Sequence, residues 1–478
     1  MSSLNKSIII VFLLTTNQIR CHSQSHVPSV SVESGAVVST GKHAPFWFYS
    51  NQYGKISTKN NSIYLLPSIY RNFKEGSKLD YSYNLSPLLR YDGLGRSYMH
   101  QWYGEVKFHF IHFTAGAKEE FYGNQDSTLS SGCIIWSKNA RPMPKLKLEV
   151  PNYTPVPFTW RYLEFKGGMA HGWFDDNEYN KNVWMHHKYF YLRLGGKLPV
   201  HVSYGVHHFA QWGGTLKGKD LPKDLPAFKN IFTAKGGDNR SPLDESMNKL
   251  GNHIGSRNFG LEGEFKNYKV SIYWQTIFED GSGKAYRNIK DGLWGMCFMI
   301  NKGSIISKIS YEFFNSTNQS GDYNDYWTLN GEKFFSSTPG GEYHEAGGND
   351  NYFNHWVYPF GFTFKKMTLG TPLITSPEIL NGDINNFILN NKVRAHFLGI
   401  EGDYKNLFFT ILINYNQNWG TNYVPFSKIK EQLSVNIVTT FINLIKWNTK
   451  LGISFSTDYG KMYGNNVGIT LKLKKEIF

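Results

Sequence analysis

The stretch VRAHFLGIEGDYKNLFFTILINY, residues 393–415, decides the fold class of this chain. Apolar side chains stand on every second residue at Val393, Ala395 and Phe397, and the alternation resumes after a polar turn at 402–406. A period of two gives a strand one apolar and one polar face. The same alternation recurs in residues 433–437, 447–455 and 467–473. Such successive strands are typical of the closing hairpins of a transmembrane β-barrel, although a soluble β-sandwich uses the same alternation.

The N-terminus has the pattern of an export signal. Lys6 precedes a mostly apolar segment, SIIIVFLLTT at 7–16, which is too short to span a bilayer as a helix but matches a signal-peptide core. Small side chains at Cys21 and Ser23 place the expected cleavage before Gln24. We therefore expect a signal peptide at 1–23 and a single mature domain at 24–478.

The composition favours an exported barrel over a helical membrane protein. No later segment offers about 18 uninterrupted apolar residues. The mean hydropathy is −0.42, yet 16% of the residues are aromatic and 46 are glycine. A barrel places aromatic residues in two interfacial girdles, and its closed sheet pairs every backbone group in lipid. We expect an all-β fold, a transmembrane antiparallel β-barrel of about 18 strands (roughly 16–18), with long extracellular loops and one or two short loop helices.

The loops of this barrel are expected to be long and polar. Residues 98–113 are predicted to form one aromatic-rich strand, whereas residues 315–354 are dense in Gly, Asn, Asp and Tyr and predict an extracellular loop. Helices are expected at 226–234 and at 377–380. In the second helix, Pro377 would occupy the first helical position.

The charge balance predicts anionic partners. The net charge is +14, from 51 Lys and Arg against 37 Asp and Glu. At the surface of a Gram-negative-type cell the anionic groups are acidic glycans and lipopolysaccharide phosphates. A barrel in the bacterial outer membrane would also contact lipid and, during biogenesis, the barrel-assembly machinery. We expect a monomer with no nucleic-acid partner.

Cys133 and Cys297 are expected either to form a disulfide or to remain free.

Short motifs rich in Gly, Trp, His, Asn and Asp follow one another along the chain. They are HAPFW with SNQYG (43–54), NARPMP (139–144), AHGWFDDN (170–177), QWGGT (211–215), GNHIGS (251–256), FEDGSG (278–283) and DGLWG (291–295). In this order, the set resembles the capsule assembly Wzi family of outer-membrane proteins, over about Val32 to Leu373. The sequence departs from the family pattern at 355–361, so no role is carried over to that loop.

The resemblance implies a lectin-like barrel that binds surface (capsular) polysaccharide and helps to attach or assemble the capsule, without a reaction, cofactor or metal. Aromatic faces stack on sugar rings, while Asn, Asp, His and Arg bind hydroxyl and carboxylate groups. The candidate residues for polysaccharide binding or for a polar network in the lumen are Trp47, Asn51, Trp136, Asn139, Arg141, His171, Trp173, Asp175, Asp176, Trp212, His253, Glu279, Asp280, Asp291, Trp294 and Asp350.

Structural roles compete with binding for these residues. Gly-Trp and Asn-Gly runs also form tight turns, and aromatic residues also fill girdles and lumens. Arg141 is expected either to join a buried ion network with Glu or Asp or to bind the ligand. The histidine spacing matches no closed metal site.

The rival functions are a diffusion channel and, less favoured, an outer-membrane lipid or glycan hydrolase. The adjacent pairs Asp175-Asp176 and Glu279-Asp280 would face opposite sides of a strand. Neither pair would then flank one glycosidic bond. We therefore expect no enzyme.

Overall fold

Eighteen antiparallel strands close into one barrel in the computed structural model of the chain. The model describes residues 27–300, 304–322, 326–334, 338–344, 348–380, 382, 387–442 and 449–477, and the expected signal peptide lies outside them. The barrel strands are β1 (Ser29–Ser39), β2 (Ser62–Arg71), β3 (Leu79–Tyr91), β4 (Gly95–Phe108), β5 (Ile111–Ala117), β6 (Pro144–Pro155), β7 (Leu163–Trp173), β9 (Trp184–Leu194), β10 (Val200–Trp212), β13 (Asn252–Glu264), β14 (Tyr268–Gln275), β15 (Gly292–Ile300), β16 (Ile306–Asn315), β22 (Val393–Tyr404), β23 (Leu407–Gly420), β24 (Pro425–Ile442), β25 (Thr449–Gly460) and β26 (Asn466–Glu476). The predicted fold class is confirmed.

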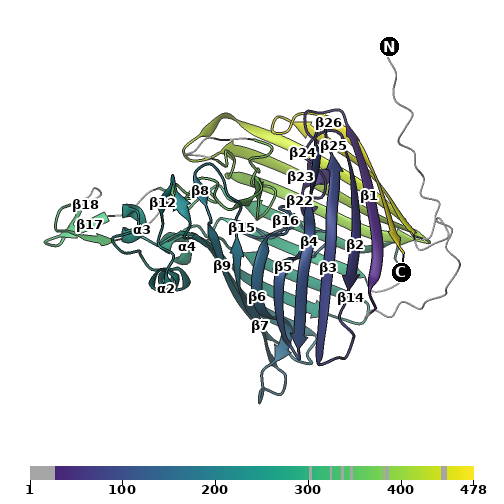
Figure 1. The fold of residues 1–478 in the computed structure, drawn as a ribbon, viewed down its shortest axis with the longest axis horizontal. Helices are drawn as coiled ribbons and strands as arrows, with labels where there is room; N and C mark the ends of the chain where they lie inside the picture. The colour runs from purple at the N-terminus through teal and green to yellow at the C-terminus, as the bar shows by residue number, and fades with distance from the viewer. Residues whose placement is uncertain are drawn as a thin grey trace, which may run out of the picture.

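Pairing between the first and last strands closes the barrel. β1 pairs with β26 from Ser31↔Glu476 to Ser39↔Gly468, so neither strand is left with an open edge. The long connections gather at one end, whereas β1 begins and β26 ends at the other, as Figure 1 shows. We call these the long-loop end and the short-turn end.

Short elements occupy the connections. The described helices are α1 (Phe46–Tyr49), α2 (Leu225–Thr233), α3 (Leu243–Met247) and α4 (Gly281–Lys284). The minor strands are β8 (Asn180–Lys181), β11 (Thr215–Leu216), β12 (Lys219–Asp220), β17 (Tyr326–Leu329), β18 (Glu332–Phe334), β19 (Glu342–His344), β20 (Thr363–Phe364) and β21 (Met367–Thr368). Within the described ranges, no helix has the length and apolar character needed to cross a membrane.

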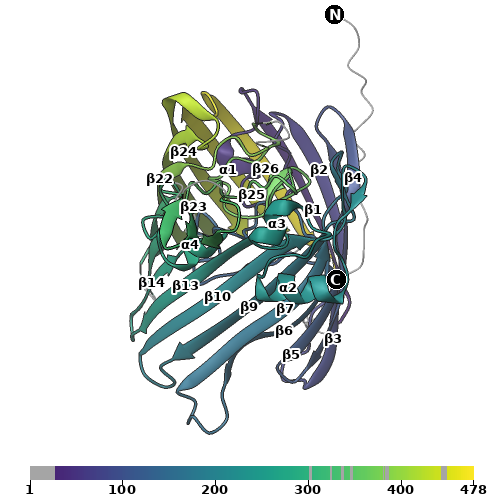
Figure 2. The ribbon, with the colours of Figure 1, turned by 90° about the vertical axis from the view of Figure 1, so that its left-hand side faces the viewer.

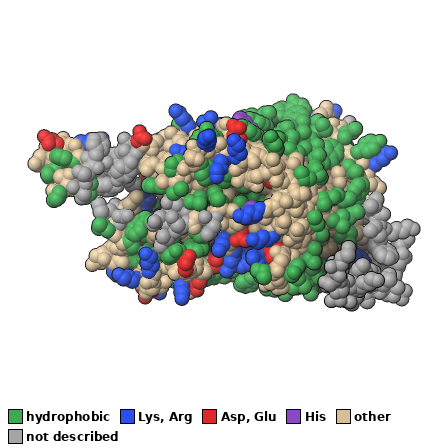
Figure 3. All heavy atoms as spheres, turned by 90° about the horizontal axis from the view of Figure 1, so that it is seen from above, with side chains coloured by type: hydrophobic (Ala, Val, Ile, Leu, Met, Phe, Trp, Pro, Cys, Tyr) green, Lys and Arg blue, Asp and Glu red, His purple; other side chains and the backbone are tan. Residues whose placement is uncertain are grey.

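The outer wall is apolar because alternate side chains of each strand point away from the lumen. Phe455 on β25 and Leu471 on β26 are both 50% exposed on this face. Figure 3 shows the hydrophobic side chains gathered in a band across the wall, with many lysine and arginine side chains on its long-loop side. This arrangement is the lipid-facing surface of a membrane barrel.

Three long connections fold into the barrel and form a plug. They are L1 (40–61), L3 (118–143) and L7 (316–392). Figure 2 shows α1 of L1 inside the ring of strands. The described parts of all three loops contribute to one apolar core with the inner wall, and its plug residues include Phe46, Trp47, Ile134, Trp136, Phe353, Phe362, Leu369 and Ile374. The lumen is therefore filled from the long-loop end.

One other long connection packs against the outside of the wall. L5 (213–251) carries α2, whose Ala227 and Ile231 bury against Ala210 and Trp212 of β10. The Oδ1 atom of Asp224 accepts a hydrogen bond from the amide of Ala227 at 3.0 Å and caps the helix. This confirms the helix predicted at 226–234.

The structure corrects two of the predicted elements. Residues 98–113 form the hairpin β4–β5 rather than one strand, because His109 adopts a left-handed turn conformation with a φ of 53°. Residues 377–380 form a turn rather than a helix. The Ser376 hydroxyl accepts a hydrogen bond from the amide of Thr368 at 3.0 Å, so it ties the turn to β21 instead of capping a helix.

β22 turns its apolar alternation inward. Val393, Ala395 and Phe397 are almost fully buried, and Phe397 packs on Trp47 with ring centroids 5.3 Å apart. The plug supplies the apolar surface that lipid supplies elsewhere.

Candidate functional site

The candidate residues of the HAPFW, SNQYG and NARPMP motifs lie in the plug, where they join its loops. The Nδ2 atom of Asn51 in L1 donates to the carbonyl oxygen of Ser131 in L3 at 2.9 Å. Asn139 of L3 is fully buried, and its Nδ2 atom donates to the Oγ1 atom of Thr368 in L7 at 2.8 Å. A Cβ atom on Gly370 would stand only 1.9 Å from the carbonyl oxygen of Ile134, so L7 and L3 meet closely there. These residues hold the plug together.

Aromatic contacts seat the plug on the wall. Trp136 stacks on Phe209 of β10 with ring centroids 5.1 Å apart, and Trp47 donates its Nε1 hydrogen to the carbonyl oxygen of Ser434 at 3.3 Å. The guanidinium of Arg141 lies 4.4 Å from the ring centre of Tyr98. Among the described residues, Arg141 forms no salt bridge, so of its two predicted roles the ion network is not seen, and its guanidinium packs on the rings of Tyr98 and Phe364.

A buried ion network that the sequence reasoning missed fixes L3 to the wall. Both Lys145 and Lys147 of β6 form salt bridges with Glu120 of L3, and Lys147 also reaches Glu149 at 2.5 Å. Burial acts to raise the pKa of Glu120, but the two ammonium groups outweigh it and lower this pKa from 4.5 to about 2. The signal in the sequence was the run Lys145-Leu-Lys-Leu-Glu149, which places three charges on one strand face.

Five candidates lie outside the lumen. His171, Trp173, Trp212 and His253 belong to the outer face of β7, β10 and β13, partly covered by L5. His253 makes a hydrogen bond between its Nδ1 atom and the Nε2 atom of His208 at 2.8 Å. Trp294 stacks between Trp274 and Phe313, with centroids 6.2 and 5.7 Å away, in a row of outward aromatic rings. That row is an aromatic girdle, so Trp294 is not part of a lumen network.

The acidic candidates Glu279, Asp280, Asp291 and Asp350 gather where L6 (276–291) meets L7. Asp291 is fully buried and accepts hydrogen bonds from the Tyr352 hydroxyl at 2.9 Å and from the Gln319 amide at 2.7 Å. Burial raises the pKa of Asp291 to about 6. Burial and the nearby Asp280 carboxylate raise the pKa of Asp350 to about 7. The cluster secures L7 through hydrogen bonds to carboxyl groups.

A cleft opens at the long-loop end between L4 (174–183) and L7, and we call it the mouth cleft. It is lined by Phe174, Asp175, Asn177, Asn180, Val183, Gln211, Tyr358, Phe360, Gly361, Thr363 and Lys366. Gln211 donates to the carbonyl oxygen of Gly361 at 2.8 Å, and Asn180 donates to that of Val357 at 3.0 Å. Aromatic, amide and charged groups therefore line this cleft, a combination that suits contact with a sugar. Its volume is only about 20 Å³, so a sugar would rest on its rim and not enter it.

Of the predicted residues, only Asp175 lines the mouth cleft. Its Oδ2 atom lies 3.5 Å from the Nζ atom of Lys365, whereas the Oδ1 atom of Asp176 accepts the amide of Asn182 at 2.7 Å. Both acidic pairs lie in loops, so the strand alternation assumed from the sequence does not apply to them. Instead, the two carboxylates have different partners: Asp175 contacts Lys365, and Asp176 contacts the amide of Asn182. Sequence reasoning missed Phe360 and Lys366, which no motif marks.

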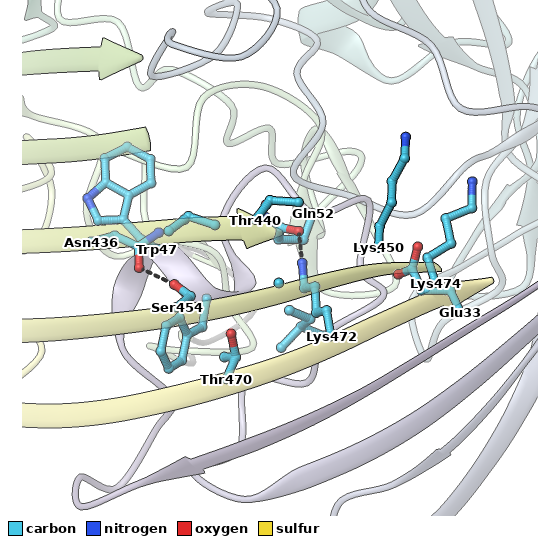
Figure 4. Close-up of a pocket in the computed structure, with 14 residues that line it drawn as sticks. Glu33, Trp47, Gln52, Asn436, Thr440, Lys450, Ser454, Thr470, Lys472 and Lys474 are labelled. Atoms are coloured by element: carbon cyan, nitrogen blue, oxygen red, sulfur yellow. Dashed lines mark hydrogen bonds between the residues drawn. The ribbon is translucent and has the colours of Figure 1, made fainter. Parts of the chain in front are cut away.

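A second hollow lies inside the barrel below α1 and has a volume of about 260 Å³. We call it the lumen cavity, and Figure 4 shows it. Its lining comes from L1 and the inner faces of β1, β24, β25 and β26: Glu33, Trp47, Phe48, Gln52, Ile56, Asn436, Val438, Thr440, Lys450, Gly452, Ser454, Thr470, Lys472 and Lys474. Of the candidates, only Trp47 lines it.

Cys133 and Cys297 are both free thiols, and both are buried. The two alternatives left open by the sequence are thereby decided in favour of unpaired cysteines.

Comparison with protein families identifies one match. Residues 17–330 match the family described as capsule assembly protein Wzi. No curated protein sequence matches the chain.

Three solved structures that resemble this chain are distant from it in sequence. An Escherichia coli outer-membrane protein, Wzi, described as a carbohydrate-binding β-barrel involved in group 1 capsule assembly, is 14% identical, with a TM-score of 0.60 over 93% of this chain and 83% of that chain. OccK5 (OpdH) of Pseudomonas aeruginosa is 10% identical, with a TM-score of 0.47 over 94% and 98% of the two chains. OccAB2 of Acinetobacter baumannii is 9% identical, with a TM-score of 0.47 over 95% and 99%.

Proposed function

This chain belongs to the capsule assembly protein Wzi family, and from that premise we propose that it is a lectin-like outer-membrane barrel. It binds an acidic capsular or other surface polysaccharide and helps to attach or assemble the capsule at the cell surface. The chain is exported with cleavage of residues 1–23, and the barrel-assembly machinery inserts it as a monomer. Its wall contacts outer-membrane lipid and lipopolysaccharide. The long-loop end faces the medium and the short-turn end faces the periplasm.

The observation that carries the proposal is the plug with the mouth cleft at its outer surface. L1, L3 and L7 fill the lumen through a shared core, which favours a surface binder over a diffusion channel. In the cleft, Phe360 offers a ring face, Asn177 an amide and Lys366 an ammonium group. These groups suit the apolar face, hydroxyls and carboxylate of a uronic acid. Exposed charges bind weakly one at a time, so retention rests on many repeats of the polymer.

In this proposal the barrel binds polysaccharide and catalyses no reaction. The paired carboxylates that a glycosidase needs on either side of one bond are engaged elsewhere, since Asp175 contacts Lys365 and Asp176 contacts the Asn182 amide. Turnover of lipid or glycan by the purified protein, lost on Asp176→Asn or Glu279→Gln, would show that this part of the proposal is wrong.

Deletion of the gene tests the function. We expect normal polymer synthesis with release of capsule into the medium, and the double variant Phe360→Ala/Lys366→Ala should behave like the deletion while still inserting as a barrel. Lys219→Ala is the matched control, because Lys219 is also exposed at the long-loop end, on β12, but lies outside the cleft. Normal cell-bound polymer in the deletion strain would refute the proposal.

A further inference from the structure

Three lysine side chains line the lumen cavity towards the short-turn end. Lys450 of β25 is directly opposite Lys474 of β26 in the sheet register, and Lys472 is one inward position further along β26. Their neighbours Leu451, Ile453, Leu471 and Leu473 point to lipid, so strand alternation directs the lysines into the lumen. Figure 4 shows Lys450 and Lys474 extending towards the same side of the cavity. Like charges placed directly opposite each other destabilise a sheet, and both side chains are at the solvent-exposed rim of the cavity, so a bound anion would be favoured there.

The protein supplies only part of that negative charge. The Nζ atom of Lys474 lies 2.9 Å from the Oε1 atom of Glu476, and Lys474 is directly opposite Glu33 of β1 in the sheet register. Glu33 also accepts a hydrogen bond from the Tyr64 hydroxyl at 2.7 Å. Lys472 donates to the neutral amide oxygen of Gln52 at 3.0 Å. Within the described part of the chain, Lys450 forms no salt bridge. The cavity therefore keeps an excess of positive charge.

The rest of the cavity suits a sugar ring. Asn436, Ser454, Thr440 and Thr470 provide amide and hydroxyl groups, whereas Trp47 lines the end of the cavity away from Lys450 and Lys474, as Figure 4 shows. Ser454 donates to the Oδ1 atom of Asn436 at 2.6 Å, which fixes two of these groups. Its volume of about 260 Å³ lies near the lower end of ligand pockets, so it would hold about one monosaccharide unit and not an extended chain.

We propose that the lumen cavity binds a carboxylate-bearing sugar residue from the periplasmic side, with Lys450 and Lys474 holding the carboxylate and the nearby Thr440 hydroxyl bonding the sugar. This inference deepens the proposed function, because it adds a second contact with the same class of acidic polymer on the other side of the plug. Ammonium groups for the carboxylate and hydroxyl partners for the ring together select a uronic acid over a neutral sugar.

Titration calorimetry on the full purified barrel in detergent tests the site. The probes are trigalacturonate, neutral maltotriose and inorganic phosphate. We expect trigalacturonate to bind best, and Lys450→Gln/Lys474→Gln to weaken it by about tenfold or more, because two charge-assisted hydrogen bonds are lost. The matched control is Lys475→Gln, which removes one charge from the neighbouring position of β26 on the opposite face. Its effect should stay within about twofold.

A second variant tests whether filling the cavity blocks binding when no lysine charge is removed. Gly452 lies in the cavity lining, and a Cβ atom there would meet Lys472 at an ordinary 3.7 Å, so Gly452→Met fills the cavity without removing a lysine. It too should weaken trigalacturonate binding. Equal loss in the Lys475→Gln control, unchanged binding in the double variant, or phosphate binding as tight as trigalacturonate would each overturn the assignment.

The two proposals fail in different ways. Capsule release in the deletion strain with no lysine-dependent binding would refute the periplasmic site alone. Lysine-dependent binding with normal capsule retention would refute the proposed function alone.

Discussion

The contact of Glu120 with Lys145 and Lys147 should be the strongest single attachment of L3 to the barrel wall. Glu120→Gln keeps the shape of the side chain but removes its charge, leaving two buried ammonium groups of β6 to share Glu149. The hydrogen bond from the Tyr122 hydroxyl to Glu120, 3.0 Å long, is also weakened. We expect L3 to lose most of its attachment.

The size of the effect follows from two independent estimates. The pKa of Glu120 falls from 4.5 to about 2, and this shift corresponds to ~3 kcal/mol of preference for the charged form in the folded state. Breaking a buried salt bridge by removing one partner costs about 3–5 kcal/mol. Because this pKa is lowered on folding, its contribution is present above about pH 4.5 and is lost as the pH falls through about 2.

Hydrogen exchange of residues 118–143 at neutral pH measures the effect. Glu120→Gln should lower the opening free energy of this loop by ~3 kcal/mol, and the strands should keep their protection. Glu178→Gln, an exposed glutamate in L4, is the control and should change nothing measurable. Adding Lys147→Met should recover part of the loss, because an apolar side chain replaces an unpaired charge. A change below about 0.5 kcal/mol in Glu120→Gln would refute this account of the network.

Three further predictions concern pH, the girdle and the lumen. The pKa of Asp350 is raised from 3.8 to about 7, so its contribution to stability is complete below about pH 4 and is lost as the pH rises through 7. The thermal unfolding midpoint of the protein should therefore fall between pH 5 and pH 8. Asp350→Asn should reduce that fall. Trp294→Ala removes two aromatic pairs and should lower the free energy of unfolding in lipid vesicles by about 2 kcal/mol with no change in polysaccharide binding; loss of binding instead would place Trp294 in the site. In planar bilayers the wild-type protein should conduct little because L1, L3 and L7 fill the lumen, and a large stable current would favour the channel.

The family motifs predicted the parts of the plug better than they predicted the site. Asn51 and Asn139 bond one plug loop to another, whereas the motif residues Trp173, Trp212, His253 and Trp294 lie on the outer face of the wall. Phe360, a half-buried ring, and Lys366, an exposed charge, line the mouth cleft but stand outside every motif. Residues of that kind carry no spacing signal, so only the folded loop identifies them.

The sequence alone determined that the chain is built from strands with two unlike faces, because the alternation has a period of two and recurs to the C-terminus. The export signal and the aromatic-rich composition favoured a membrane barrel over a β-sandwich, and chain length with the family resemblance predicted about 18 strands. The sequence did not determine which surface each face meets. Val393, Ala395 and Phe397 point to the plug, whereas Leu471 points to lipid, although the local pattern is the same. Register across strands decided the rest, because hydrogen bonding brought Lys450 opposite Lys474 and folded Glu120 against Lys145. Closure of the sheet and the folding of its loops into the lumen decide which residues become neighbours. No local stretch of the chain encodes either event.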